Sequence, residues 1–312
     1  MVPDPIVLGT RGSQLALWQA GRVKDQIERA GHPVTLQQIT TRGDEVQDVP
    51  MSEVGDEALF TKELDRAMLR GEVDIAVHSL KDLPSRIPDG IELAAISDRA
   101  NPFDAFVAHP SFDGPLEALP DGATIATSSL RRRAQLKAWR TDLRIVPVRG
   151  NVDSRLDKLA ASEWHGMVLA VAGLTRMGRG DAIRTAFSPS IMIPAVGQGA
   201  LGITCRTEDA ALHDLVQDVI HDRAAGRAAA AERGFMKRIG GGCHVPTGAW
   251  ARETDDGRLL VDGCIAALDG SQLFRDRRIC SGGDEAATGA ALATHLLDAG
   301  GAEIIAAVRA TS

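Results

Sequence analysis

Residues 6–40, "IVLGTRGSQLALWQAGRVKDQIERAGHPVTLQQIT", indicate the fold class. Ile6–Leu8 is a short apolar run typical of a strand, and Val34–Thr40 is a second one. Between them, small and apolar residues recur every three or four positions and define one helix face: Ala16, Ala20, Val23, Ile27 and Ala30. Ser13 is the predicted N-cap of this helix, and Gly31 its predicted end. A strand, helix and strand in this order predict parallel strands covered by helices.

The same alternation continues through most of the chain. A helix near Thr61–Arg70 and a strand at Val73–His78 follow, and a second unit begins after Asn101-Pro102. Its predicted strands are Asp104–Ala108, Thr124–Thr127, Leu143–Val148 and Met167–Val171, and its predicted helices are Leu130–Arg140 and Val152–Ser162. The glycine-rich "PAVGQGALGI" (194–203) predicts a crossing between domains. Beyond about His221, a hairpin turning at Asp269-Gly270 and a helix near 285–299 predict a small α+β unit.

Composition favours a cytosolic globular protein. The 312 residues are 44% hydrophobic and 25% charged, which is enough for two or three domains. The N-terminus has no basic leader, and no apolar run approaches membrane-spanning length. The four cysteines have neither CxxC nor zinc-like spacing and are expected to be reduced: Cys205, Cys243, Cys264 and Cys280. A net charge of −7 and 4% aromatic residues argue against nucleic acid and anionic membranes as partners.

Arginines gather at three predicted strand-to-helix turns, namely 10–13, 127–133 and 149–155. From Thr127 to Lys158 there are nine Lys/Arg residues against three Asp/Glu residues. Ligands of open α/β sheets collect at the carboxyl ends of the strands, where these turns lie. Because cations are disfavoured in the first turn of a helix, a bound anion would explain their position there. We therefore predict a polyanion site, with a solvated arginine-rich surface as the alternative.

Two further motifs carry candidate chemistry. "HSLKDLP" (78–84) puts Lys81 and Asp82 at another strand end, either as a carboxylate inside a cationic cleft or as an ordinary surface ion pair. His78 is expected to have a structural role. "GGGCHVPTG" (240–248) sets Cys243 among glycines that would let a large group approach its sulfur. No metal-ligand spacing is present, so Cys243 is either an attachment point or a free thiol in a turn.

Seven motifs together resemble the porphobilinogen deaminase (hydroxymethylbilane synthase) family, in the family's order from about Ile6 to Val308: "TRGSQLALWQA", "HSLKDLP", "TSSLRRRAQL", "RGNVDSRLDKL", "AVAGLTRMG", "PAVGQGALGI" and "GGGCHVPTG". The resemblance implies an α/β protein with two lobes like those of type II periplasmic binding proteins and a small α+β C-terminal domain. The implied domains are residues 1–99 with 200–218, residues 103–195, and residues 222–312.

The resemblance also implies an activity. Family members join four porphobilinogen molecules head to tail with loss of ammonia and release hydroxymethylbilane. They build the product on a dipyrromethane cofactor, which would be held here by a thioether to Cys243. No metal is implied, and the expected enzyme is a cytoplasmic monomer in haem biosynthesis.

Site residues follow from the matching positions. Those that match the family's cofactor-binding positions, besides Cys243, are Lys81, Asp82, Thr127, Ser129, Arg131, Arg132 and Arg155. Those that match positions for substrate or chain elongation are Arg11, Ser13, Arg149, Arg155, Arg176 and Gln198. Asp82 matches the catalytic carboxylate, which would contact pyrrole N–H groups and stabilise the cation left when ammonia departs. The segment 52–64, "SEVGDEALFTKEL", is more acidic than the family's mobile loop, which puts its gating role in doubt.

A binding protein is the alternative from another class. A two-lobed anion receptor of the periplasmic-binding-protein type would account for the strand-end arginines and the glycine-rich crossing. It would leave Asp82, Cys243 and the C-terminal domain without a purpose. The intact mass of the purified protein separates the two readings, because the enzyme should carry two covalently linked pyrroles.

Overall fold

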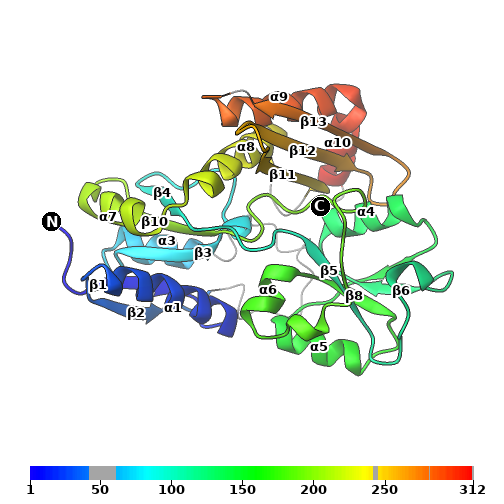
Figure 1. The fold of residues 1–312 in the computed structure, drawn as a ribbon, viewed down its shortest axis with the longest axis horizontal. Helices are drawn as coiled ribbons and strands as arrows, with labels where there is room; N and C mark the ends of the chain where they lie inside the picture. The colour runs from blue at the N-terminus through cyan, green and yellow to red at the C-terminus, as the bar shows by residue number, and fades with distance from the viewer. Residues whose placement is uncertain (42–60, 242–244, 281, 311–312) are drawn as a thin grey trace.

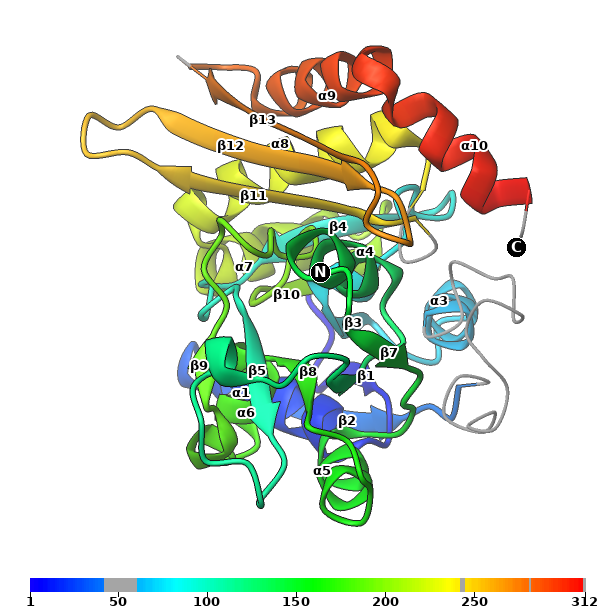
Figure 2. The same cartoon turned by 90° about the vertical axis from the view of Figure 1, so that its right-hand side faces the viewer.

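The computed structural model describes residues 1–41, 61–241, 245–280 and 282–310. In these residues three β-sheets, each with its own helices, form three units around a central junction (Figure 1, Figure 2). We call the first two units lobe 1 and lobe 2, and the last the C-terminal unit. The predicted α/β architecture with two lobes and a small α+β unit is confirmed. The exact domain boundaries stay a prediction.

Lobe 1 is built on a five-stranded sheet in the order β2-β1-β3-β10-β4. Its strands are β1 (Ile6–Thr10), β2 (Val34–Gln38), β3 (Ile75–Ser79), β4 (Ile91–Ile96) and β10 (Leu201–Arg206). The first three run parallel, and β10 runs antiparallel to both of its neighbours. Its helices are α1 (Gln14–Arg29), α3 (Lys62–Leu69) and α7 (Ala210–Ile220). Apolar residues of α1, α7 and the sheet, among them Val23, Ile27 and Val216, form one core cluster.

Lobe 2 repeats this pattern in the order β7-β6-β8-β5-β9. Its strands are β5 (Asp104–Ala108), β6 (Thr124–Ala126), β7 (Arg144–Val146), β8 (Gly166–Ala170) and β9 (Thr185–Ala186). Strands β7, β6 and β8 are parallel, and β5 is antiparallel to β8 and β9. Its helices are α4 (Leu130–Trp139), α5 (Val152–Ala160) and α6 (Val171–Arg176). Two segments, around 97–103 and 187–200, connect the lobes.

The C-terminal unit combines an antiparallel sheet with three helices in the described residues. The sheet has the order β11-β12-β13, with β11 (Thr247–Glu253), β12 (Leu259–Ala266) and β13 (Leu273–Cys280). Its helices are α8 (Arg223–Ile239), α9 (Glu285–Leu296) and α10 (Ala302–Ala310). Helices α8 and α9 approach so closely that a Cβ added at Gly289 would lie only 1.8 Å from the Ala231 carbonyl oxygen.

The segment Glu285–Ala310 is long and apolar enough to cross a membrane by length and composition. The expectation that no apolar run approaches that length was therefore wrong for this segment. The structure breaks it at Gly300, whose φ of 123° is not helical. Leu292, Leu296 and Ile304 from this segment pack in the same core cluster as Phe235 of α8, which is the packing of core helices.

A buried ion pair ties the units together where the connecting segments pass. Arg99 donates to both carboxylate oxygens of Glu232, at 2.6 and 3.2 Å, and Glu232 is fully buried in α8. Glu232 also accepts from the backbone N–H groups of Gly197 and Ala251, at 2.7 and 2.8 Å. Both connections between the lobes are thus held against the C-terminal unit.

Candidate functional site

The first arginine turn lies at the end of β1. The Ser13 side chain accepts a hydrogen bond from Ala16 N at 3.3 Å and caps α1, as predicted. Arg11 and Ser13 line a small cavity of about 60 Å³ together with Asp82. The structure therefore brings two residues predicted to contact substrate to the predicted catalytic carboxylate.

Lys81 and Asp82 lie in a short 3₁₀ turn, Leu80–Asp82, that follows β3. The Lys81 Nζ donates to the Gln198 Oε1 at 3.2 Å. Burial is the main cause that lowers the pKa of Lys81 to about 8; Arg132 and Arg131 act in the same direction, and Asp82 and Asp104 oppose the shift. An ammonium held in this way binds a carboxylate at a lower desolvation cost than a hydrated surface lysine would.

His78 is buried beside this turn. Its Nε2 lies 3.1 Å from the Thr204 Oγ1. Burial, followed by the nearby Arg11 charge, lowers the pKa of His78 to about 4, so the ring is neutral at pH 7. A neutral ring with a hydroxyl partner agrees with the structural role expected from the sequence.

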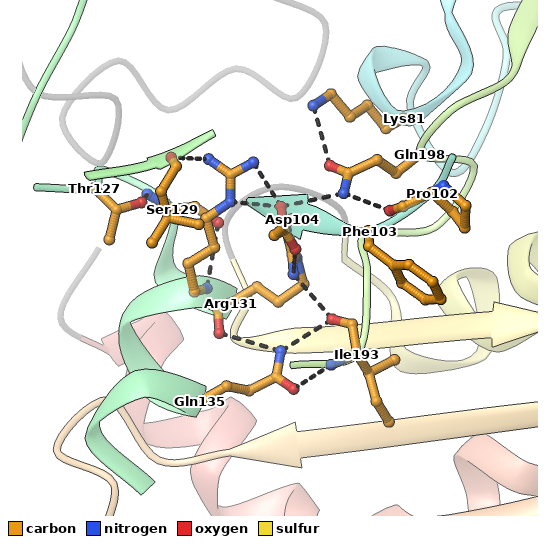
Figure 3. Close-up of polar contacts among 12 residues, drawn as sticks. Lys81, Pro102, Phe103, Asp104, Thr127, Ser129, Arg131, Gln135, Ile193 and Gln198 are labelled. Carbon is orange, nitrogen blue, oxygen red and sulfur yellow. Dashed lines mark hydrogen bonds and ion pairs between the residues drawn. The ribbon is translucent and has the colours of Figure 1, made fainter. Parts of the chain in front are cut away.

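Arg131 and Arg132 are buried in the first turn of α4 and share one carboxylate, Asp104 (Figure 3). Arg131 donates to both Asp104 oxygens at 2.7 and 3.2 Å, and Arg132 donates from Nε to Oδ1 at 2.9 Å. Arg131 also donates to the Ile193 carbonyl oxygen and Arg132 to that of Val168. From the sequence, we expected a bound ligand to compensate the charge of these arginines. In the structure, Asp104 of strand β5 compensates part of that charge.

Two pKa shifts follow from this arrangement. Burial alone would raise the pKa of Asp104, but Arg131 and Arg132 outweigh it and hold that pKa well below its ordinary value. Burial lowers the pKa of Arg132, which Asp104 partly restores. Two guanidinium groups against one carboxylate leave the cluster positively charged. It can therefore still attract an external carboxylate.

The hydroxyls of the second arginine turn shape the start of α4. The Thr127 Oγ1 accepts from Ser129 N at 3.2 Å, and the Ser129 Oγ accepts from Arg132 N at 3.4 Å as the helix N-cap. The Ser128 Oγ donates to the Val148 carbonyl oxygen at 2.8 Å, which ties the ends of β6 and β7 together. Thr127 and Ser129 thereby lie beside the arginine pair.

Arg149 and Arg155 have unused donors. The Arg149 Nη1 and the Arg155 Nε are buried without a hydrogen-bond partner in the part of the chain that the structure describes. Burial lowers the pKa of Arg155 to about 10, Arg132 and Arg149 add to this shift, and Asp82 opposes it. The influence of Asp82 on Arg155 brings lobe 1 and lobe 2 into one electrostatic site. A buried guanidinium donor without a partner calls for an anionic acceptor.

Arg176 is the last residue of α6 in lobe 2, and Gln198 lies in the connecting segment 187–200. Arg176 donates to the Gly199 carbonyl oxygen at 2.6 Å, and its guanidinium lies over the Trp18 ring at 5.6 Å. Burial, aided by the Arg22 charge, lowers the pKa of Arg176 to about 10. Gln198 is 1% exposed and contacts both lobes. Both residues bond across lobe 1 and lobe 2 in this structure. The predicted crossing at 194–203 indicated this position for Gln198, whereas the motif of Arg176 did not indicate such a role.

Cys243 lies outside the described residues, as do residues 52–60 of the acidic segment. Helix α8 ends just before the cysteine motif at Gly240, whose φ of 73° is left-handed. Arg309 of α10 donates to the Gly240 carbonyl oxygen at 2.6 Å. Cys205, Cys264 and Cys280 are buried and unpaired, and burial raises the pKa of Cys205 to about 12 and that of Cys264 to about 11. The thiols of Cys205 and Cys264 are therefore not nucleophiles at neutral pH.

Within the described ranges, no group of His, Cys, Asp or Glu residues is arranged to hold a metal ion. Asp104 is the site residue that sequence reasoning missed. Its one sequence signal is its position, because an acidic residue at the start of a strand whose other residues are apolar is unusual.

Comparison with known proteins identifies the family. Residues 6–214 match "Porphobilinogen deaminase, dipyromethane cofactor binding domain", and residues 227–298 match "Porphobilinogen deaminase, C-terminal domain". The porphobilinogen deaminase of Roseiflexus castenholzii is 47% identical over 306 residues, which cover 97% of this chain and 99% of that protein. That of Synechococcus elongatus is 44% identical over 310 residues, with 98% and 96% covered.

Among solved structures, a periplasmic substrate-binding protein of an ABC transporter from Coxiella burnetii aligns at a TM-score of 0.43 and 16% identity, covering 73% of this chain and 96% of that one. The resemblance and the dipyrromethane cofactor predicted from the motifs are confirmed by the family matches over both parts of the sequence. The chain belongs to the porphobilinogen deaminase family.

Proposed function

We propose that this chain joins four porphobilinogen molecules head to tail and releases hydroxymethylbilane, with Asp82 as the catalytic carboxylate. Family membership supports a small-molecule substrate that loses ammonia. The observation that carries the residue assignment is the gathering of cations from both lobes near Asp82. The negative charge of Asp82 acts on the pKa of both Lys81 and Arg155, and Arg11 lines the small cavity that Asp82 also lines.

The described residues fit the cofactor. Each ring of dipyrromethane carries an acetate and a propionate, so a bound cofactor brings several carboxylates into the site. The Arg149 Nη1 and the Arg155 Nε are buried donors that lack an acceptor among the residues that the structure describes, and a carboxylate would supply one. We assign cofactor binding to Lys81, Asp82, Thr127, Ser129, Arg131, Arg132 and Arg155, and covalent attachment to Cys243. The cofactor supplies the pyrrole ring to which the first substrate is joined.

The remaining assigned residues would hold substrate and the growing chain. They are Arg11, Ser13, Arg149, Arg155, Arg176 and Gln198. For Arg176 and Gln198 this assignment requires the contacts between the lobes to rearrange, because both side chains bond across the connection. Guanidinium groups suit this task because they bind carboxylates with two parallel hydrogen bonds.

Asp82 acts where positive charge develops. The protonated aminomethyl group of the substrate leaves as ammonia with the electron pair of its C–N bond, and the pyrrole that remains carries the positive charge. A carboxylate that accepts a hydrogen bond from the pyrrole N–H stabilises that cation. The new C–C bond then releases a proton from the attacked ring carbon, and Asp82 is placed to assist its transfer.

Acidic net charge and low aromatic content support the absence of nucleic-acid and membrane partners. The family resemblance supports a cytoplasmic monomer. Its acidic segment 52–64 should attract carboxylate-rich product less than a basic segment would.

Intact-mass measurement tests the function. The wild-type protein should exceed its chain mass by two linked pyrroles, and Cys243→Ser should lose the whole excess. Asp82→Asn should keep the excess but lose about 10²- to 10⁴-fold in kcat, the usual contribution of a general acid-base group. A bare chain mass together with reversible anion binding would instead favour the receptor. Near-normal turnover by loaded Asp82→Asn would remove Asp82 from its role.

A further inference from the structure

We propose that Gln198 and Asp104 are positioning residues that fix Lys81 of lobe 1 relative to Arg131 and Arg132 of lobe 2. A continuous chain of hydrogen bonds joins these groups across the connection between the lobes (Figure 3). The inference rests on the proposed binding of the cofactor by Lys81 and the arginine pair. The new element is the pair of residues that sets the distance between Lys81 and the arginine pair.

Gln198 is the bridge in this chain. Its Oε1 accepts from the Lys81 Nζ at 3.2 Å, and its Nε2 donates to the Asp104 Oδ1 at 3.1 Å and to the Pro102 carbonyl oxygen at 2.7 Å. All three contacts use one side chain that is 1% exposed. An amide suits this position because it accepts and donates at once, which neither a carboxylate nor an ammonium does at neutral pH.

The backbone of Gln198 is held independently of its side chain. Its carbonyl oxygen accepts from the Arg99 Nε at 2.9 Å, and its N–H donates to the Ala195 carbonyl oxygen at 3.0 Å. The flanking Gly197 and Gly199 have φ values of 72° and 97°, a left-handed region that favours glycine. Substitution of the side chain alone should therefore leave the crossing segment in place.

Asp104 is the other end of the bridge. It is the first residue of β5 and fully buried, and it orients both guanidinium groups by accepting from each. The Asp104 Oδ1, which accepts from the Arg132 Nε, also accepts from the Gln198 Nε2. A shift of Gln198 is therefore transmitted to the arginine pair through a single carboxylate oxygen.

The consequence is a division of the cationic cleft. Lys81, Arg131 and Arg132 are connected to one another through protein hydrogen bonds, so their spacing is set before any ligand arrives. The Arg149 Nη1 and the Arg155 Nε are buried without such partners within the described residues. A preset spacing lowers the ordering cost of binding carboxylates at fixed positions.

A double-mutant cycle tests the bridge. Gln198→Met keeps the approximate volume of the side chain and removes its hydrogen bonds, and Lys81→Met removes the ammonium. For each variant and for the double variant, kcat and KM are measured per cofactor-loaded enzyme, with loading taken from intact mass. Gln217→Met is the matched control, because this amide donates to the Ala94 carbonyl oxygen on the far side of lobe 1.

If Gln198 acts through Lys81, the two substitutions are non-additive. Lys81→Met should then cost at least about fivefold less in kcat/KM when Gln198 is already methionine. Gln217→Met should show wild-type kinetics and no coupling to Lys81→Met. If Gln198→Met fails to fold, Gln198→Asn, which is too short to reach both partners, replaces it in the cycle.

Three results would overturn the bridge. They are additive effects, unchanged kcat and KM in loaded Gln198→Met, or a lower melting temperature as the sole change. A wild-type protein without the two-pyrrole excess would instead reject the proposed function, so the two failures are distinguishable.

Discussion

Lobe 1 and lobe 2 share one plan and differ in how they handle buried charge. In each, three parallel strands are followed by an antiparallel strand that enters directly after a connecting segment, β10 in lobe 1 and β5 in lobe 2. In each, a serine caps the helix that follows the middle parallel strand. The turn after β1 and the turn after β6 are therefore equivalent, and each lies at the carboxyl end of the middle parallel strand of its own sheet.

The charges at these edges are balanced differently. Lobe 2 buries Arg131 and Arg132 in a helix turn and compensates them with the fully buried Asp104. In lobe 1, Lys81 bonds to an amide, and its pKa is lowered to about 8 mainly by burial. The comparison teaches that lobe 2 stabilises the buried pair Arg131 and Arg132 with its own carboxylate. Lobe 1 instead holds Lys81 at a cost to folding that a bound carboxylate would reduce.

The largest expected effect on stability comes from removal of the negative charge that compensates Arg131 and Arg132 in lobe 2. Asp104→Asn keeps the shape of the side chain but leaves two buried guanidinium groups without an anion, which should cost about 3–5 kcal/mol of unfolding free energy. Urea denaturation at pH 7 measures it, with Asp113→Asn, a fully exposed carboxylate near Arg184, as the control. A loss below that of the control would show that the pair does not depend on Asp104.

The pH dependence of the same contact has a definite sign. The pKa of Asp104 is lower in the folded protein than its ordinary value of 3.8. Its stabilisation is therefore complete above that value and is lost as pH falls below it. The deficit of Asp104→Asn should shrink in acid.

Lobe 1 should respond in the opposite direction. Because burial lowers the pKa of Lys81 from 10.5 to about 8, the unfolded chain holds this proton more tightly than the folded one. Lys81→Met should therefore raise the unfolding free energy at pH 7 by about 1–3 kcal/mol. The gain should decline as pH rises from about 8 to 10.5, where the folded wild type loses the proton first.

Denaturation of cofactor-free protein over this pH range measures the effect, with Lys237→Met on the exposed face of α8 as the control. Destabilisation by Lys81→Met at pH 7 would mean that Lys81 is compensated after all. The contrast between the lobes would then disappear.

The elements with strong local signals were predictable from the sequence. Helix α1, with its Ser13 cap, and strand β5 were placed within a few residues, because apolar spacing and capping are local properties. The end of "PAVGQGALGI" was expected to be part of a crossing but forms β10 from Leu201. Its position in the lobe 1 sheet depends on long-range pairing with β3 and β4, which no local pattern encodes.

Helices α7 and α8 and strand β11 were also missed. Alanine-rich α8 has little apolar contrast along its length, and its role is to bring Glu232 to Arg99. For the site, motifs gave residue identities but not their partners. Asp104 of strand β5 compensates Arg131 of helix α4, 27 residues away, and this contact exists only in the folded chain.

The smallest expected effect compares the two helix caps. Ser13→Ala removes the acceptor of Ala16 N in lobe 1, and Ser129→Ala removes that of Arg132 N in lobe 2. Each should cost about 1 kcal/mol of unfolding free energy. Because the caps lie in different lobes, the double variant should be additive within about 0.5 kcal/mol.

Activity separates the caps where stability does not. The Ser129 cap orients the helix turn that carries Arg131 and Arg132, so Ser129→Ala should lower cofactor loading measured by intact mass. Ser13→Ala should leave loading unchanged and raise KM, because Ser13 lines the cavity beside Asp82. Equal loading and equal KM in the two variants would show that the serines serve folding alone. In that case the difference between the lobes would lie in their charged residues.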